Sequence, residues 1–247
     1  MNKQLQKIEN KLKQGDWYRI AFLGDSITST EWVHPNWREV IEYVLKMELE
    51  IAMGEWELPW WKLRCLNAGY NGASTSELMK FVEKDVIPCK PNLAIFMDTY
   101  NDKYKNINPD EHAKNLDIIL SKLTVGVGDV VFSNSIARFN EKANMENKKY
   151  IATAETVVKK YKNKIRVVDM YSAFSQLELD KFFTFKYTKD DIDAIAGIKV
   201  GDIDFGHPNS LGNAYVAKIM LKEIFGLDFN PDRYIDDSLA GKKYPGY

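Results

Sequence analysis

The stretch Arg19-Ile20-Ala21-Phe22-Leu23-Gly24-Asp25-Ser26 decides how this chain folds, because an apolar run stops abruptly at Gly-Asp-Ser. An apolar run closed by a turn sequence is typical of a buried parallel strand. In open α/β sheets, ligands bind in the crevice outside the carboxyl ends of the strands. Ser26 therefore stands where a nucleophile is useful. Serines at such turns are more often caps or turn residues, and a lone hydroxyl needs a positioned base.

Strand-like and helix-like segments alternate along the rest of the chain. Strands are expected at residues 18–23, 63–66, 93–97, 129–133 and 165–170. Helices are expected between them, and a strong helix over 214–225 follows the last strand. This alternation predicts an α/β fold, a three-layer α/β/α sandwich with a five-stranded parallel sheet and helices on both faces.

A single domain over residues 1–247 accounts for the length of the chain. Within it we expect an N-terminal helix at 1–15 and an irregular surface insertion at 51–62. Residues 226–247 are rich in Asp, Pro, Gly and Tyr and are expected to form a C-terminal surface tail.

The net charge bears on the partners of the protein, and the N-terminal sequence bears on its location. The chain has 34 basic and 35 acidic residues, so no net field favours nucleic acid or a membrane surface as a partner. The first residues lack the continuous apolar core of a signal peptide, and a cytoplasmic location is expected.

No cofactor or metal is expected from the sequence. The two cysteines, Cys65 and Cys89, have neither metal-site spacing nor the density of a disulfide-rich domain. The glycine-rich phosphate-binding motif of nucleotide-binding proteins does not occur in the sequence.

Three histidines limit the search for a base. His207 follows Asp204 by three residues, and side chains at this spacing on one helical turn are neighbours. The carboxylate can then orient one ring nitrogen and leave the other to take a proton from Ser26. Asp-x-x-His also occurs as a structural cap before a helix, so this pair alone does not decide between the two roles.

The other two histidines are weaker candidates. His34 is nearer to Ser26 in sequence, but Glu31 is its only acidic neighbour at a useful spacing. His112 follows Asp110 and Glu111 at a charged helix start and is expected at the surface.

Acyl transfer also needs donors for a developing oxyanion. Gly72 follows the second predicted strand in a loop leading into a helix, where backbone N–H groups are unpaired. Asn101 follows the third predicted strand at the same edge, where its amide can donate. A turn glycine with positive φ and an Asx turn explain each residue singly. Their common position at the edge that carries Ser26 favours the oxyanion interpretation.

The chain resembles the SGNH (GDSL-type) hydrolases in four short motifs that occur in the family's order between about residues 18 and 225. The motifs are Gly24-Asp25-Ser26, Asn67-x-Gly69-x-x-Gly72, Asn101-Asp102 and Asp204-x-x-His207. The resemblance implies a flavodoxin-like fold with Ser26 as nucleophile, His207 as base and Asp204 as its orienting acid. It further implies an oxyanion hole built from the Ser26 and Gly72 backbone N–H groups and the Asn101 side chain.

Two positions depart from the family pattern. Ile27 stands where Leu is usual, which is a mild change. Thr99 stands where Gly is usual, and a side chain there would narrow the pocket or displace Asn101.

Together these residues predict a serine ester hydrolase that forms an acyl-enzyme on Ser26. The expected substrate is a small-molecule or carbohydrate ester with a short acyl group such as acetyl. One alternative is an acyltransferase with the same triad, in which a sugar or alcohol replaces water. The other is a catalytically silent carbohydrate-binding module of the same fold.

Aromatic residues near the predicted mouth either stack on a sugar or pack the core and the insertion. The tryptophans concerned are Trp32, Trp37, Trp56, Trp60 and Trp61. Three phenylalanines before Asp204 either line an acyl pocket or anchor a loop: Phe182, Phe183 and Phe185.

Overall fold

Five parallel strands form one sheet in the computed structural model, which describes residues 2–192 and 198–243. The strands are β1 (Tyr18–Gly24), β2 (Leu63–Gly69), β3 (Leu93–Met97), β4 (Asp129–Ser133) and β5 (Ile165–Val168), in the order β2-β1-β3-β4-β5. The predicted sheet and its all-parallel pairing are confirmed. The order reverses between β1 and β3, and such a switch point is where open α/β sheets bind ligands.

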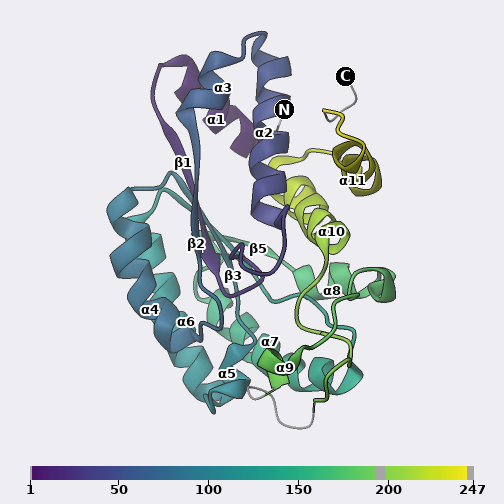
Figure 1. Cartoon of the computed structure of the whole chain (residues 1–247). Helices are drawn as coiled ribbons and strands as arrows, with labels where there is room; N and C mark the ends of the chain where they lie inside the picture. Colours follow the sequence, from purple (N-terminus) through teal and green to yellow (C-terminus); the bar gives the residue numbers. More distant parts are fainter. Residues whose placement is uncertain (1, 193–197, 244–247) are drawn as a thin grey trace.

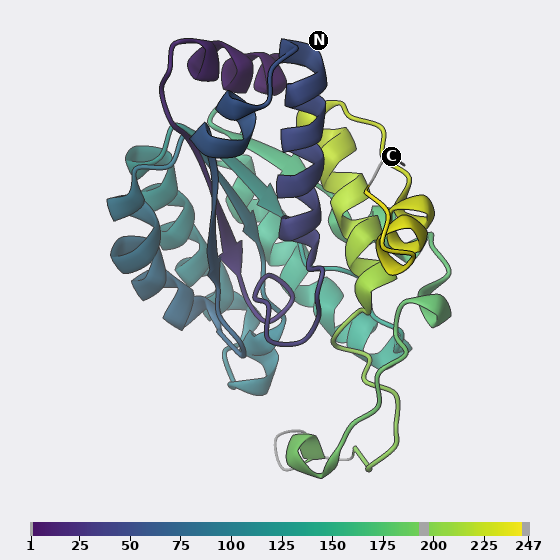
Figure 2. The same cartoon turned by 45° about the horizontal axis from the view of Figure 1, so that its top comes forward.

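Helices cover both faces of the sheet and complete the predicted three layers (Figures 1 and 2). The main ones are α1 (Lys3–Lys13), α2 (Trp37–Met53), α4 (Thr75–Phe81), α6 (Pro109–Gly126), α7 (Glu141–Lys159) and α10 (Ser210–Met220). Shorter helices are α3 (Glu57–Lys62), α5 (Asn101–Tyr104), α8 (Met170–Ser175), α9 (Lys189–Ile192) and α11 (Pro231–Leu239).

The alternating direction of the side chains of β1 explains why helices cover both faces of the sheet. Ile20 and Phe22 point into the core shared with α2 and α10, whereas Ala21 and Leu23 point into the core shared with α4, α6 and α7. Successive side chains of a strand face opposite sides of the sheet. Because both sides are buried, the β1 sequence reads as a continuous apolar run.

The predicted irregular insertion at 51–62 is wrong. Helix α2 continues to Met53, and α3 follows after a short turn. Trp60 in α3 packs edge-on against Tyr43 of α2, and its indole N–H donates to Glu50 at 2.6 Å. These contacts with α2 hold a helix that has no helical period of its own in the sequence.

Both chain ends carry a helix. α1 lies across the amino end of the sheet, at the top of Figure 1, as the sequence predicts. The predicted surface tail contains α11, whose Tyr234 is buried and contacts the rings of Tyr43 and Phe229.

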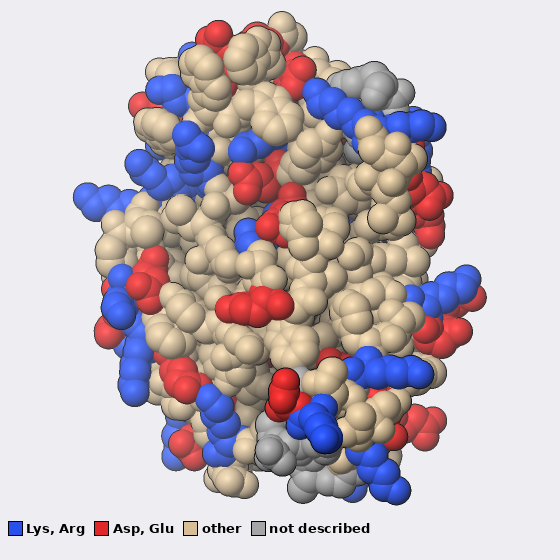
Figure 3. Space-filling view, in the orientation of Figure 1, with Lys and Arg blue, Asp and Glu red and all other residues tan. Residues whose placement is uncertain are grey.

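Charged side chains of both signs are interspersed over the face of the molecule shown in Figure 3. In the part of the chain that the structure describes, every helix is too short or too polar to cross a bilayer.

Candidate active site

Ser26, His207 and Asp204 form one hydrogen-bonded chain at the carboxyl edge of the sheet. His207 Nε2 lies 3.0 Å from Ser26 Oγ, and His207 Nδ1 lies 2.7 Å from Asp204 Oδ2. Ser26 comes from the turn after β1, and the other two residues come from the segment that leads into α10. Residues 181 positions apart are thus brought within hydrogen-bond distance. This is the geometry of a nucleophile, a base and an orienting acid.

The turn after β1 is tight because glycines let the chain approach closely. Gly24 and Gly69 pair at the ends of β1 and β2. A Cβ on Gly24 would lie 2.2 Å from Thr28 Oγ1, and one on Gly69 would lie 2.4 Å from Ser29 N. Asp25 closes the turn, since its Oδ1 accepts the Ile27 N–H at 3.0 Å. The loop therefore packs back over the strand ends and holds Ser26 at the site.

Asp204 is held in the ionised form that a base-orienting residue needs. Its carboxylate is almost fully buried and accepts backbone N–H groups of Gly206 at 2.7 Å and His207 at 3.3 Å. Burial alone would raise its pKa. The hydrogen bond and charge of the His207 ring, with smaller contributions from Gly206 and Tyr187, instead hold the pKa of Asp204 below its usual value.

Trp32 covers the face of the His207 ring. The two ring centroids are 3.9 Å apart and the planes differ by 9°, a stacked arrangement. The Trp32 indole N–H donates to Asn71 Oδ1 at 3.0 Å, which ties the loop after β1 to the loop after β2. Trp32 is thus placed to restrict the orientation of the imidazole.

The predicted oxyanion residues lie in the same cavity as Ser26 and His207. Gly72 lines it with φ of +68°, a conformation that favours glycine. Within residues 2–192 and 198–243, the backbone N–H groups of Ser26 and Gly72 have no acceptor. Asn101 also lines the cavity, and its Nδ2 donates to the Ala73 carbonyl at 3.1 Å.

Thr99 does not narrow this cavity, contrary to the expectation from sequence. Its side chain is buried and turned away, with Oγ1 2.9 Å from Asp25 Oδ2 and 2.8 Å from the Ala73 carbonyl oxygen. The hydroxyl also accepts the Asn101 N–H at 3.0 Å. Thr99 therefore joins the loops after β1, β2 and β3 and supports Asn101.

The other two histidines lie elsewhere. His34 is exposed and pairs with Glu39 at 3.0 Å, so it does not compete with His207. The predicted surface position of His112 is wrong, because its side chain is fully buried between Asp98 and Asp102. Helix α6 begins at Pro109, and its inward face at this point carries the imidazole rather than an apolar group.

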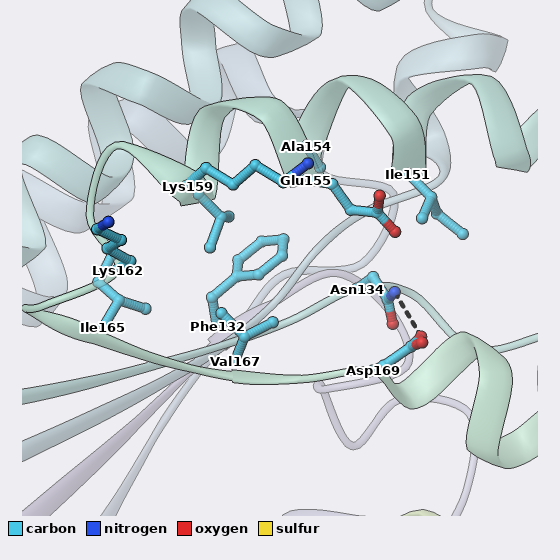
Figure 4. A pocket seen from close by; sticks show the side chains of 11 residues that line it. Phe132, Asn134, Ile151, Ala154, Glu155, Lys159, Lys162, Ile165, Val167 and Asp169 are labelled. Carbon is cyan, nitrogen blue, oxygen red and sulfur yellow. Dashed lines mark hydrogen bonds between the residues drawn. The ribbon is translucent and has the colours of Figure 1, made fainter.

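The catalytic candidates open into a cavity of about 310 Å³. Its lining residues are Asp25, Ser26, Gly72, Tyr100, Asn101, Tyr104, Lys105, Arg138, Tyr187, Phe205, Gly206 and His207. A larger cavity of about 430 Å³ lies between α7 and the edge strand β5 (Figure 4). None of the described residues that line the larger cavity is a serine or histidine, and its Asn134 and Asp169 are hydrogen-bonded to each other. The smaller cavity is therefore the candidate active site.

Most of the predicted aromatic stacking platform lies away from this cavity. Trp37 is fully buried in the core. Trp56, which directly precedes α3, and Trp61, within α3, are half exposed. α3 ends where β2 begins, at the opposite edge of the sheet, roughly 20 Å away for a strand of this length.

Phe182 and Phe183 are buried in the core beside α10, so they anchor the loop before Asp204. Phe185 accepts the Asp204 N–H through its backbone carbonyl at 2.9 Å. The aromatic wall of the cavity is instead built by Tyr100, Tyr104, Tyr187 and Phe205.

Sequence reasoning missed two features of this wall. Tyr187 is buried beside the Asp204 carboxylate, and burial followed by this negative charge raises its pKa far above the usual range. Arg138 enters the cavity from the loop that follows β4. The position of Arg138 after a predicted strand was the available signal, since all parallel strands end at the same edge.

Comparison with known proteins supports this architecture through structure alone. No family model matches the chain, and no curated protein matches it in sequence. Solved structures do match. An alpha/beta hydrolase from the metagenome of Lake Arreo, Spain, is 18% identical with a TM-score of 0.61, covering 87% of this chain and 98% of its own. The chain has the fold of these hydrolases.

Two further solved structures match the fold of this chain. A lipase/acylhydrolase from Enterococcus faecalis is 21% identical over 85% of this chain and 96% of its own, with a TM-score of 0.60. An acetylxylan esterase from Geobacillus stearothermophilus is 21% identical over 87% and 96%, with a TM-score of 0.59. The fold predicted from the four motifs is therefore confirmed.

Proposed function

We propose that this protein is a serine ester hydrolase that forms an acyl-enzyme on Ser26. The observation that carries the proposal is the continuous chain Ser26 Oγ–His207 Nε2 and His207 Nδ1–Asp204 Oδ2, at 3.0 and 2.7 Å, in an open cavity. A hydroxyl becomes an effective nucleophile when a base takes its proton as it attacks.

In the first half-reaction Ser26 Oγ attacks the ester carbonyl and its proton moves to His207 Nε2. The resulting oxyanion is held by the N–H groups of Ser26 and Gly72 and by the Asn101 amide. Asn101 keeps one N–H on Ala73, while its other N–H has only a 3.4 Å contact with Asp25. Collapse of the intermediate expels the alcohol, which takes the proton from Nε2.

In the second half-reaction a water molecule gives a proton to Nε2 and attacks the acyl-enzyme. The carboxylic acid leaves and Ser26 regains its proton. Asp204 stabilises the imidazolium that forms twice in the cycle, and its lowered pKa means that it stays ionised.

A short acyl group suits this site. The cavity volume is at the small end of ligand pockets. The matched esterase from Geobacillus stearothermophilus is named for acetylxylan, and two other matched structures are its catalytic mutants, one with a serine and one with a histidine changed to alanine. An acetylated carbohydrate is therefore our first candidate substrate.

The test combines labelling with hydrolysis. A fluorophosphonate probe should label the folded protein, and mass spectrometry should place the label on Ser26, with Ser26→Ala unlabelled. A series of para-nitrophenyl esters from acetate to octanoate should show the highest kcat/KM at the short end. A folded protein that neither reacts with the probe nor hydrolyses any ester would refute the proposal.

A further inference from the structure

Arg138 is a buried cation in the active-site cavity. The residue is 5% exposed and lines the cavity that holds Ser26 and His207. Burial raises the pKa of the Asp25 carboxyl and the charge of Arg138 acts against this rise, but among the described residues no carboxylate oxygen forms an ion pair with the guanidinium. Arginine is almost never buried to this degree unless it is paired.

The existing contacts of Arg138 use only part of its hydrogen-bonding capacity. Nη1 donates to the Gly206 carbonyl oxygen at 3.2 Å, and Cζ lies 4.3 Å from the centroid of the Tyr100 ring. Nε is buried and has no acceptor in the described part of the chain. A guanidinium carries five N–H donors. Nη2 has no acceptor among the described residues and, unlike Nε, is not an enclosed atom, so its two N–H groups are the ones that a ligand in the cavity can reach.

The backbone of Arg138 is held firmly in place. Its N–H donates to Asn144 Oδ1 at 2.8 Å, and Asn144 Nδ2 donates back to the Arg138 carbonyl at 2.7 Å. Asn144 belongs to the first turn of α7. The planar face of the guanidinium rests on Tyr100, so the side chain is preorganised before any ligand arrives.

The other charged residues of the cavity are already engaged. Lys105 pairs with Glu77 at 2.5 Å, and both side chains are about 40% exposed. The two carboxylate oxygens of Asp25 accept donors from the surrounding loops, and those of Asp204 accept Gly206 and His207. Arg138 is the cation whose donors remain available.

We propose that the cavity binds esters in which the acyl part or the alcohol part carries a carboxylate, and that Arg138 binds this carboxylate. The inference rests on the proposed ester hydrolysis. The rigid fork of a guanidinium matches the two oxygens of a carboxylate, which favours arginine for this recognition. In a cavity of about 310 Å³ that also holds Ser26, the carboxylate and the ester must belong to one small molecule.

The kinetic test uses two matched pairs of esters. With the charge on the acyl side, para-nitrophenyl hydrogen glutarate is compared with para-nitrophenyl valerate. With the charge on the alcohol side, para-carboxyphenyl acetate is compared with para-carbamoylphenyl acetate. We expect the protein to prefer the anionic member of one pair by about tenfold or more in kcat/KM, as for a charge-assisted bidentate contact. The preferred pair identifies the side that carries the charge.

Variants separate recognition from structural support. Arg138→Met should reduce the ratio of kcat/KM for the anionic and the neutral ester to about one, and Arg138→Lys should retain part of the preference. Lys105→Met, at the rim, should keep the preference ratio. Melting temperatures show whether each variant folds, and the lysine variant serves if the methionine variant does not. The inference is overturned if kcat/KM is equal for the anionic and the neutral member of each pair. It is also overturned if Arg138→Met lowers kcat/KM equally for charged and neutral esters.

A binding measurement keeps this test independent of turnover. The Ser26→Ala variant is titrated calorimetrically with glutaramate and valeramide, and with para-hydroxybenzoate and para-hydroxybenzamide. We expect one carboxylate to bind at least tenfold more tightly than its neutral counterpart, and Arg138→Met to remove the difference. Binding through Arg138 without any hydrolysis would leave this inference standing and refute the hydrolase. Hydrolysis without preference or Arg138-dependent binding would do the reverse.

Discussion

His207 and His112 are both bound to an aspartate through Nδ1, at 2.7 and 2.9 Å, but their Nε2 atoms meet different partners. His207 Nε2 faces the Ser26 hydroxyl in an open cavity, with the side chain 17% exposed. His112 Nε2 faces a second carboxylate, Asp98 Oδ2 at 3.2 Å, in a site closed to solvent.

The environment of His112 sets its protonation state. Burial alone would lower the pKa of His112, but the charges and hydrogen bonds of Asp98 and Asp102 outweigh it and raise this pKa to about 10. His112 is therefore a permanent cation near neutral pH, held between two carboxylates. A base needs a single acid behind it and a proton donor in front, which is the arrangement around His207.

The His112 cluster also supports the loops of the active site. Asp102 accepts the Thr75 N–H at 2.7 Å and the Thr75 hydroxyl at 2.5 Å, and it directly follows Asn101. Thr75 begins α4, two residues after Ala73, whose carbonyl accepts the Asn101 amide. His207 thus lies against the Ser26 hydroxyl, whereas His112 holds the loops that carry the proposed oxyanion donors.

Removal of the His207 ring is expected to have the largest effect on activity. His207→Ala should lower kcat for ester hydrolysis by at least roughly 10⁴-fold, since loss of a triad member removes the activation of the nucleophile. Its melting temperature should stay within a few degrees of the parent. The matched control is His34→Ala, an exposed histidine paired with Glu39, which should keep kcat within threefold. Residual activity in His207→Ala near the parent level would mean that another group is the base.

Removing the His112 ring should lower the unfolding free energy of the protein and have a much smaller effect on ester hydrolysis. His112→Ala leaves Asp98 and Asp102 buried without their cation, and breaking a buried pair in this way costs about 3–5 kcal/mol of unfolding free energy. Urea unfolding measures this loss. Activity per molecule of folded protein, counted by fluorophosphonate labelling, should fall less than tenfold. A variant as stable as the parent would show that the buried cluster is not the support described here.

The sequence could identify one of these clusters and not the other, for a physical reason. Asp204 and His207 are three residues apart, so one turn of backbone brings them together, and their order after the Gly-Asp-Ser turn adds independent evidence. Asp98 directly follows β3, Asp102 lies in α5 and His112 lies in α6. No local spacing relates His112 to the two aspartates, and only the packing of these elements makes them neighbours.

The same limit of sequence-based prediction applies to the side chain of Arg138. Its place after a predicted strand puts it at the carboxyl edge of the sheet, which alternation alone could establish. Its inward direction depends on Asn144 and Tyr100, which hold its backbone and its guanidinium. The α/β/α fold and the strand ends were predictable because they follow from runs of apolar residues, whereas α3 is held by contacts with α2.

A substitution between the two clusters tests how they cooperate. Asn101 lines the cavity next to Asp102, and Asn101→Ala removes a proposed oxyanion donor while leaving both histidines in place. We expect kcat to fall by about 10²–10³-fold, as for other oxyanion-hole side chains, with KM changed little. Stopped-flow measurement of acylation isolates the step. A rise in KM, and with it a fall in kcat/KM, with kcat unchanged would assign Asn101 to substrate binding.

The smallest expected effect is the dependence of stability on pH that His112 creates. A histidine has a pKa of about 6.5 in an unfolded chain, and His112 has a pKa of about 10 in the folded protein. Between these values the folded state holds one more proton than the unfolded state. The stabilisation is therefore fully present below about pH 6.5 and is lost as the pH rises toward 10.

Asp98→Asn should weaken this dependence, because it removes one of the two charges while an amide oxygen can still accept the Thr99 N–H at the present 2.9 Å. Unfolding free energies are measured in urea at pH 6.5 and 9.5. The parent should be more stable than the variant at pH 6.5, and this difference should shrink by about 1–3 kcal/mol at pH 9.5. NMR gives the direct reading, since the His112 ring resonances of the parent should remain those of an imidazolium at pH 8 and those of Asp98→Asn should move toward the neutral form. If His112 in the parent titrated near pH 6.5, two carboxylates would not be enough to make it a permanent cation, and the contrast with His207 would have to rest on access to Ser26 alone.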